Sequence, residues 1–395
     1  MISHTFRIGL WEGPRLFAVP TDADMDARFR EIAECGIDTI FLFAELQNPE
    51  WLDRTLAAAV RNDLSLIVDT SAVWRDAAKR AEIIARTRDC PAVIAYNIMD
   101  EPPVSFIGDL APAAAAFREA VPDKAVFVNL NPNYAPPPYL PEGETRRARY
   151  RAYLAQFLDA VPVEVLSLDF YPYVGDPDAE GRMKTAMLEN LADAALAARA
   201  HGVPFAGFLQ TSRWGRFDDN RDRTSPWHGT RLPCPSELSW LAGVHLVFGA
   251  RMLTDFLYWS RSGTRPDQRV PGVFDGIVWE DGTRSPMFDA VRRVHADARA
   301  AAAQLTDCTL AGVMTAGLTD EENTAVGELR LERFGTVDDL TTAGRAIAGC
   351  FTSPDGGKRM FVMNADDIGD AAIEVTVGQT ALHLLPGEGR VVTGV

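Results

Sequence analysis

Short apolar runs alternate with longer amphipathic segments over the first three quarters of the chain. A bounded apolar run of four to eight residues favours a buried strand, whereas apolar residues recurring every three or four positions favour a helix. The pattern predicts eight strands: Thr5–Leu10, Ile37–Ala44, Leu64–Val68, Ala92–Asp100, Lys124–Asn129, Val163–Phe170, Pro204–Leu209 and Arg251–Trp259. It predicts a helix after each strand: Thr21–Cys35, Asn48–Arg61, Arg75–Arg88, Ile107–Ala120, Thr145–Ala160, Arg182–His201, Ser236–Phe248 and Ser285–Ala303.

Eight strand–helix units in succession are the signature of a (β/α)8 barrel. In such barrels the active site lies at the C-terminal ends of the strands. An open, doubly wound sheet is the competing fold, but no GxGxxG sequence follows the first strand. We therefore predict an α/β protein with a TIM barrel over residues 1–305.

The pattern of apolar and polar residues changes after Leu305. Short alternating segments are separated by turn signals such as Asp355–Gly357 and Pro386–Gly387, a pattern typical of antiparallel strands. We predict a small antiparallel, β-sandwich-like domain over residues 306–395. Its expected strands are Gly344–Phe351, Arg359–Met363, Ile373–Val377, Ala381–Leu385 and Gly389–Thr393.

The composition limits the classes of molecule that the protein is expected to bind. A net charge of −16 without any Lys/Arg run argues against nucleic acid and against anionic membranes. No apolar stretch has the length of a membrane span, and residues 1–20 show no signal-peptide pattern. Five scattered cysteines without metal-ligand spacing favour a reducing compartment, so we expect a cytoplasmic protein with no metal and no cofactor. The sequence leaves open whether the protein forms a homo-oligomer.

One stretch, residues 92–103, carries the strongest chemical signal. An apolar run of strand length ends in two adjacent carboxylates, Asp100 and Glu101, and two prolines then prevent the strand from continuing. Carboxylates at the rim of a sheet can titrate and reach a ligand. A loop-capping role for Glu101, and an orienting role for Asp100, are the structural alternatives.

Alternation along the other strands indicates which side chains point into the barrel. In the sixth strand the polar residues Ser167, Asp169 and Tyr171 share one face, and the apolar residues occupy the other. The same reasoning predicts further inward pairs on other strands: Asn97 with Glu101, Asn129 with Asn131, Arg7 with Trp11, and Asp255 with Trp259. We interpret Asp255 as part of a buried ion pair with Arg7, because the two lie on neighbouring strands.

Aromatic residues complete the predicted mouth. Most of the eight tryptophans fall at or after strand ends, namely Trp11, Trp74, Trp214, Trp227, Trp259 and Trp279. Flat aromatic faces at a cleft stack on the apolar faces of sugar rings; the structural alternative is that they cover the top of the barrel. Glu101 is the candidate acid, and we expect repulsion from Asp100 and Asp169 to raise its pKa.

The chain resembles the clan A glycoside hydrolases, which are retaining (β/α)8 enzymes. The resemblance is carried by Asp100-Glu101-Pro102, by the Leu168–Pro172 end of strand six and by the small C-terminal domain. It implies that Glu101 is the acid/base. It also implies that Asp100 occupies the place of an Asn that contacts the sugar, and that a nucleophile Glu should end strand seven.

The chain departs from the clan at that last position, where it has Gln210. A neutral amide can neither form a glycosyl ester nor act as a general base. Three explanations stay open: a loop carboxylate, a carboxylate from another strand, or sugar binding without cleavage. The loop candidates are Asp218, Asp219 and Asp222, and the strand candidates are Asp169, which we favour, followed by Glu45, Asp69 and Glu12.

We therefore predict a glycoside hydrolase that acts on a small glycoside or oligosaccharide, with Glu101 and Asp169 as the catalytic pair. The alternatives are a non-catalytic carbohydrate-binding barrel, an inverting glycosidase using Asp169, and a different barrel enzyme, such as a metal-dependent hydrolase or isomerase that uses the carboxylate-rich rim. The residues expected to bind substrate are Trp11, Glu12, Asp100, Asn131, Tyr171, Gln210, Trp214 and Trp259.

Overall fold

Eight parallel strands close into a barrel in the computed structural model, which describes residues 5–14, 19–43, 49–218, 226–263 and 272–395. Around the barrel the order is β1-β10-β7-β6-β5-β4-β3-β2, so each strand lies beside its neighbour in the sequence of barrel strands. The prediction of a TIM barrel is confirmed. The strands are β1 Arg7–Leu10, β2 Thr39–Leu42, β3 Ser65–Asp69, β4 Val93–Asp100, β5 Ala125–Leu130, β6 Leu166–Leu168, β7 Phe205–Gln210 and β10 Met252–Phe256.

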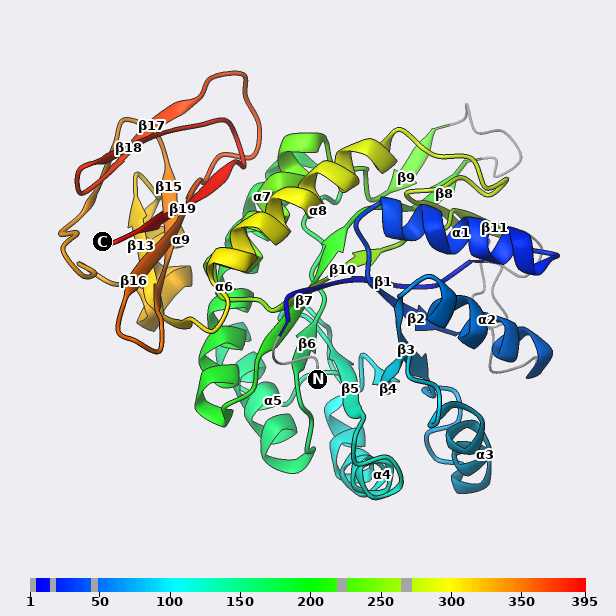
Figure 1. Cartoon of the computed structure of the whole chain (residues 1–395). Coiled ribbons are helices and arrows are strands. Elements are labelled where there is room, and N and C mark those ends of the chain that lie inside the picture. Colours follow the sequence, from blue (N-terminus) through cyan, green and yellow to red (C-terminus); the bar gives the residue numbers. More distant parts are fainter. Residues whose placement is uncertain (1–4, 15–18, 44–48, 219–225, 264–271) are drawn as a thin grey trace.

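Helices cover the outside of the barrel (Figure 1). Their starts follow local capping chemistry: Thr21 forms a capping box at the first helix, and the side chains of Asp76 and Asp176 accept backbone N–H groups at two others. The helices are α1 Asp22–Glu34, α2 Pro49–Arg61, α3 Ala77–Thr87, α4 Ile107–Ala120, α5 Arg146–Ala160, α6 Pro177–His201, α7 Pro235–Val247 and α8 Met287–Gln304. A short 3-10 turn, Val104–Phe106, precedes α4. The predicted strand end Ala44 and helix start Asn48 lie outside the described residues.

A small sheet lies over the C-terminal side of the barrel, where the sequence predicts only long loops. Its strands are β8 Arg213–Phe217, β9 Trp227–Gly229, β11 Arg261–Gly263 and β12 Gly272–Asp275, in the order β11-β12-β8-β9. The prediction of loops over Gln210–Pro235 and Ser260–Arg284 is therefore corrected; it missed these strands because they are short and follow no apolar alternation.

The C-terminal domain contains two antiparallel sheets, as expected for a small β domain, and lies to one side of the barrel (Figure 1). One sheet has the order β13-β15-β16-β19 and the other β14-β17-β18. The sequence did not predict β13, β14 or the helix α9. The elements are β13 Thr309–Ala316, α9 Asp320–Val326, β14 Leu340–Thr342, β15 Ala346–Thr352, β16 Lys358–Asn364, β17 Ile373–Val377, β18 Thr380–Leu384 and β19 Gly389–Thr393.

Ion pairs join the domain to the barrel. Asp193 on α6 is buried between Arg147 and Arg151 of α5, at 2.9 Å from each guanidinium. Arg151 also pairs with Glu328 at 2.7 Å, after the end of α9. A buried carboxylate would be costly without its partners, so Asp193 holds both arginines in place. Arg147 then donates to the carbonyls of Thr324 and Ala325 on α9 at 2.9 and 3.1 Å, which connects the domain to the barrel.

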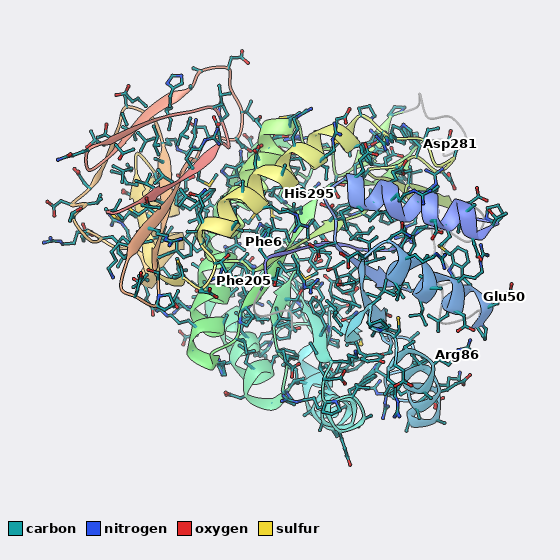
Figure 2. The ribbon with its side chains drawn as sticks, in the orientation of Figure 1. Phe6, Glu50, Arg86, Phe205, Asp281 and His295 are labelled. Atoms are coloured by element: carbon teal, nitrogen blue, oxygen red, sulfur yellow. The ribbon has the colours of Figure 1, made fainter. Side chains whose placement is uncertain are left out.

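The prediction that Asp255, on β10, points into the barrel is wrong. Asp255 points out of the barrel toward α8, and its carboxylate lies 3.2 Å from the His295 ring. His295 lies on α8 (Figure 2). Arg7, its expected partner, instead donates to the Ser65 hydroxyl at 3.0 Å and lies 3.6 Å from Asp38. The ion pair expected for Asp255 therefore exists with a different partner, contributed by a helix that the strand pattern could not place.

No helix in the described part of the chain is both long and apolar enough to cross a membrane.

Candidate active site at the mouth of the barrel

The end of β4 turns sharply at Glu101. The register between β4 and β5 shifts between Asn97 and Met99, and Glu101 itself has φ 45°, in the left-handed region. Its backbone N–H donates to the Asn129 carbonyl at 2.8 Å. A non-glycine residue in this conformation costs roughly 1–3 kcal/mol and persists only where its surroundings hold it. Local conformational preference therefore does not explain a glutamate at this position, and a functional role explains it better.

Buried groups hold this turn from below. The Pro102 carbonyl accepts a hydrogen bond from the Tyr153 hydroxyl at 2.7 Å and another from the Asn131 side-chain amide at 3.0 Å. The Val104 N–H donates to the Tyr139 carbonyl at 2.9 Å. Asn131, a predicted substrate contact, is thus engaged in positioning the loop that carries Glu101.

The side chains of Glu101 and Asp169 lie close enough for each to affect the pKa of the other. Asp169 follows β6 and is 6 % exposed, whereas Glu101 is half-buried. Two ionised carboxylates in a buried site repel each other, which favours a proton on one of the two. The structure thus brings together Glu101 and Asp169, the two residues predicted as the catalytic pair.

Burial dominates the electrostatics of this pair, which we call the dyad. It raises the pKa of Glu101, while the Asp169 side chain acts in the opposite direction. Burial raises the pKa of Asp169 well above its ordinary value, and the charges of Glu101 and Asp100 add to this. Burial is thus the first cause of the raised pKa of Glu101, and the like-charge repulsion that we expected acts within the Glu101–Asp169 pair.

Polar neighbours orient the acidic groups. The Asn129 side-chain amide donates to Asp100 at 3.2 Å, and its carbonyl oxygen accepts from the Ser167 hydroxyl at 3.0 Å. The Tyr171 side chain lies near Asp169 and acts to lower the pKa of that carboxyl, against the larger effect of burial. These residues come from β4, β5 and the end of β6, so three adjacent strands fix the position of one cluster of carboxyl groups.

Aromatic rings cover the neighbouring part of the barrel mouth. Tyr171 contacts Trp214 and Phe256 at ring-centroid distances of 4.9 and 5.3 Å. Trp11 packs on Phe43 at 4.6 Å. Three of the predicted substrate contacts, Trp11, Tyr171 and Trp214, therefore belong to a set of aromatic residues at the C-terminal ends of the strands.

Two other predicted contacts are placed differently. Glu12 is buried and lies 3.4 Å from the Arg261 guanidinium, so it takes part in an ion pair. Trp259 is 0 % exposed: its ring lies 5.5 Å from the Arg28 guanidinium and its N–H faces the Glu280 carbonyl at 3.4 Å. The placement of Trp259 at the mouth is corrected, because its ring has no surface to offer a ligand.

The side-chain amide of Gln210 is hydrogen-bonded to backbone groups of two loops. The side-chain nitrogen donates to the carbonyls of Tyr173 and Arg231 at 3.0 and 3.1 Å, and the side-chain oxygen accepts the Tyr173 N–H at 3.0 Å. A carboxylate could make only the last of these three bonds. The amide therefore links β7 to two loops, a role that the sequence alone does not signal.

The other candidate partners of Glu101 have partners of their own. Asp218 pairs with His228 at 2.7 Å on the surface. Asp69 accepts from the Asn97 amide at 2.5 Å and the Ser71 hydroxyl at 2.6 Å, and burial raises its pKa to about 6. Glu45, Asp219 and Asp222 lie outside the described residues. Within the described ranges, no group of His, Cys, Asp and Glu side chains could hold a metal ion.

No protein-family model and no curated protein sequence matches the chain. Solved structures do: the β-galactosidase of Rahnella sp. R3 aligns over 82 % of this chain with a TM-score of 0.57 and 11 % identity. The β-galactosidase of Bacillus circulans sp. alkalophilus aligns over 83 % with a TM-score of 0.51 and 13 % identity. The chain covers 60 % and 61 % of these two proteins. At such identity the likeness shows the fold alone, a TIM barrel of the kind found in glycoside hydrolases.

The raised pKa of Asp169 predicts how stability depends on pH. A carboxyl whose pKa is raised by folding keeps its proton where the unfolded chain has lost it, so the unfolding free energy falls as pH rises above about 4. We expect Asp169→Asn to reduce this fall, by about 1.4 kcal/mol for each unit by which folding raises the pKa. Urea denaturation between pH 4 and pH 8 measures the effect. Asp297→Asn, on the exposed side of α8, is the matched control; an equal change there would point to a general charge effect.

The bonding of Gln210 predicts that Gln210→Glu does not create a working nucleophile. The carboxylate would face two carbonyls without a donor, and we expect a loss of about 2–4 kcal/mol in unfolding free energy. Gln304→Glu, at the exposed end of α8, is the control and should change stability by less than about 0.5 kcal/mol. A stable Gln210→Glu variant with increased glycosidase turnover would contradict this reading of the site.

Proposed function

We propose that the protein is a glycoside hydrolase in which Glu101 and Asp169 carry out general acid/base chemistry. The observation that carries the proposal is the contact between these two carboxyl groups at the C-terminal ends of β4 and β6. Glycoside hydrolysis needs a pair of carboxyl groups, one to protonate the leaving oxygen and one to attack the anomeric carbon or to activate water. A dyad holding one proton supplies both forms at once.

The contact is closer than the working separation of such pairs, which is about 5–5.5 Å in retaining enzymes and about 6.5–9.5 Å in inverting ones. A substrate must therefore separate the carboxyl groups. Glu101 is the member that moves in this proposal, because it is half-buried and has the longer side chain, whereas Asp169 is fully enclosed. The rotation carries the acid toward the open side of the mouth.

The proton balance follows from that movement. As the dyad opens, Asp169 gives its proton to Glu101, and Glu101 then delivers it to the oxygen of the leaving group. Asp169, now ionised and near the Tyr171 side chain, takes a proton from the attacking water or attacks the anomeric carbon itself. In either route water supplies the proton that restores the dyad. The inverting route with Asp169 as base needs no residue at the Gln210 position.

The ligand we propose is a small uncharged glycoside or oligosaccharide. Aromatic rings at the mouth suit the apolar faces of sugars, and the chain's net charge of −16 disfavours polyanionic partners such as nucleic acid and anionic membranes. The chemistry needs no cofactor. A cytoplasmic location belongs to the same proposal, because the cysteines form no disulfide pairs among the described residues.

Carbohydrate binding without cleavage is the second candidate. The observation that favours it is the amide of Gln210, which is bonded to backbone groups at the position where clan A hydrolases carry their nucleophile. Calorimetry separates the two candidates: binding of a sugar without turnover, across the same glycosides used for activity, would favour the binding protein.

Glu101→Gln is the direct test of the enzyme. The amide keeps the size of the side chain but has no acidic proton, so we expect turnover of 4-nitrophenyl glycosides to fall by about 100-fold or more. The panel should include β-D-galactosides, β-D-glucosides and β-D-mannosides. Glu119→Gln, on the exposed face of α4, is the control and should keep wild-type turnover. Unchanged activity in a folded Glu101→Gln variant would remove Glu101 from the mechanism.

A further inference from the structure

A proline-rich segment, residues 131–141, leads from β5 to α5 beside the dyad. It carries two exposed tyrosines, Tyr134 at 39 % and Tyr139 at 38 %. They are among the few large apolar side chains that are exposed in the described ranges. Tyrosine rings held at a surface next to a site are a common means of ligand binding, because a large rigid area costs little conformational entropy to order.

The segment is anchored at several points around Tyr134. The Asn133 N–H donates to the Asn190 side chain at 2.8 Å, and the Asn133 amide donates to the Ala186 carbonyl at 3.0 Å, both on α6. The Ala135 N–H donates to the Pro132 carbonyl at 3.1 Å. The residues on both sides of Tyr134 are therefore fixed before any ligand arrives, which lowers the entropic cost of binding.

The Tyr134 side chain reaches from the surface to the dyad. Its ring meets Phe170, the neighbour of Asp169, edge-on at 4.9 Å. Burial, together with the charges of Asp169 and Glu101, raises the pKa of its hydroxyl, and the Tyr171 backbone acts in the opposite direction. The Tyr134 hydroxyl is thus near enough to Asp169 and Glu101 to be affected by their charges, while part of the residue is open to solvent.

We propose that the Tyr134 ring is the platform on which the leaving group of the substrate stacks. The proposal rests on the proposed function. The leaving group must lie toward solvent so that it can depart, and it must lie beside the acid that protonates its oxygen. Tyr134 meets both conditions, since its ring is exposed and its segment is joined to the Glu101 loop through Val104 and Tyr139.

The chemistry of the platform sets the preferred leaving group. A neutral aromatic ring selects a planar or flat apolar face, such as an aryl group or the apolar face of a pyranose. It offers no charge to a phosphate or a carboxylate. Leaving groups that are small and aliphatic gain nothing from the ring, so the platform separates substrates by the group that departs and leaves the choice of the cleaved sugar to the deeper part of the mouth.

The test compares two activated glycosides of the sugar that the wild type cleaves fastest, one 4-nitrophenyl and one trifluoroethyl. We expect Tyr134→Ala to lower the ratio of their kcat/KM values about tenfold, because only the aryl group has a face to stack. Tyr134→Phe should keep the ratio, since it keeps the ring. Tyr139→Ala is the matched control, because Tyr139 is equally exposed and holds Val104 only through its backbone carbonyl.

The outcomes separate this proposal from the function on which it rests. An equal loss for both glycosides in Tyr134→Ala would mean that Tyr134 only supports the dyad, and an unchanged ratio would mean that it touches no leaving group; each overturns the platform. If the wild type cleaves no glycoside, the proposed function fails, and calorimetry with the 4-nitrophenyl glycosides then decides. Binding that weakens about tenfold in Tyr134→Ala but not in Tyr139→Ala supports the platform, and any other binding result overturns it.

Discussion

The close approach of two carboxyl groups, that of half-buried Glu101 and that of buried Asp169, is the constraint on which the rest of this site depends. Glu101 and Asp169 could not both be ionised in contact, and neither has a cationic partner among the described residues around it. The dyad exists because the barrel brings the ends of β4 and β6 to one mouth and excludes water from Asp169. Folding therefore stores in these strand ends an arrangement that is unfavourable for stability but suited to acid/base chemistry.

Much of the surrounding structure serves to hold that arrangement. Asn131 and Tyr153 fix the turn after Glu101, and Gln210 ties β7 to the loop after β6. The same loop continues to Tyr173, whose hydroxyl donates to Asp367 of the C-terminal domain at 3.1 Å. Lys184 on α6 pairs with Asp367 at 2.8 Å. The small domain is thus connected to the loop beside the dyad, and its attachment helps to define the shape of the mouth.

The sequence predicts the barrel because each strand and helix has its own local period, and it predicts Glu101 because a carboxylate followed by two prolines is hard to explain as packing. Asp169 follows from alternation along β6. The other features depend on contacts between distant segments. Asp255 pairs with His295, 40 residues away, and Gln210 is saturated by carbonyls from two loops. Trp259 follows a strand, and residues in that position often lie at the barrel mouth. Here α1 and the turn at Glu280 cover it instead.

Carboxyl-carbon NMR over a pH titration tests the central claim most directly. In protein labelled at the side-chain carboxyl carbons of Asp and Glu, the account predicts two coupled resonances, assigned by their loss in Asp169→Asn and Glu101→Gln, that together retain one proton at neutral pH. The proton should leave only at higher pH, because burial and the neighbouring charge both oppose the second ionisation. Two independent carboxyl groups that are both ionised at pH 7, with ordinary pKa values, would contradict it.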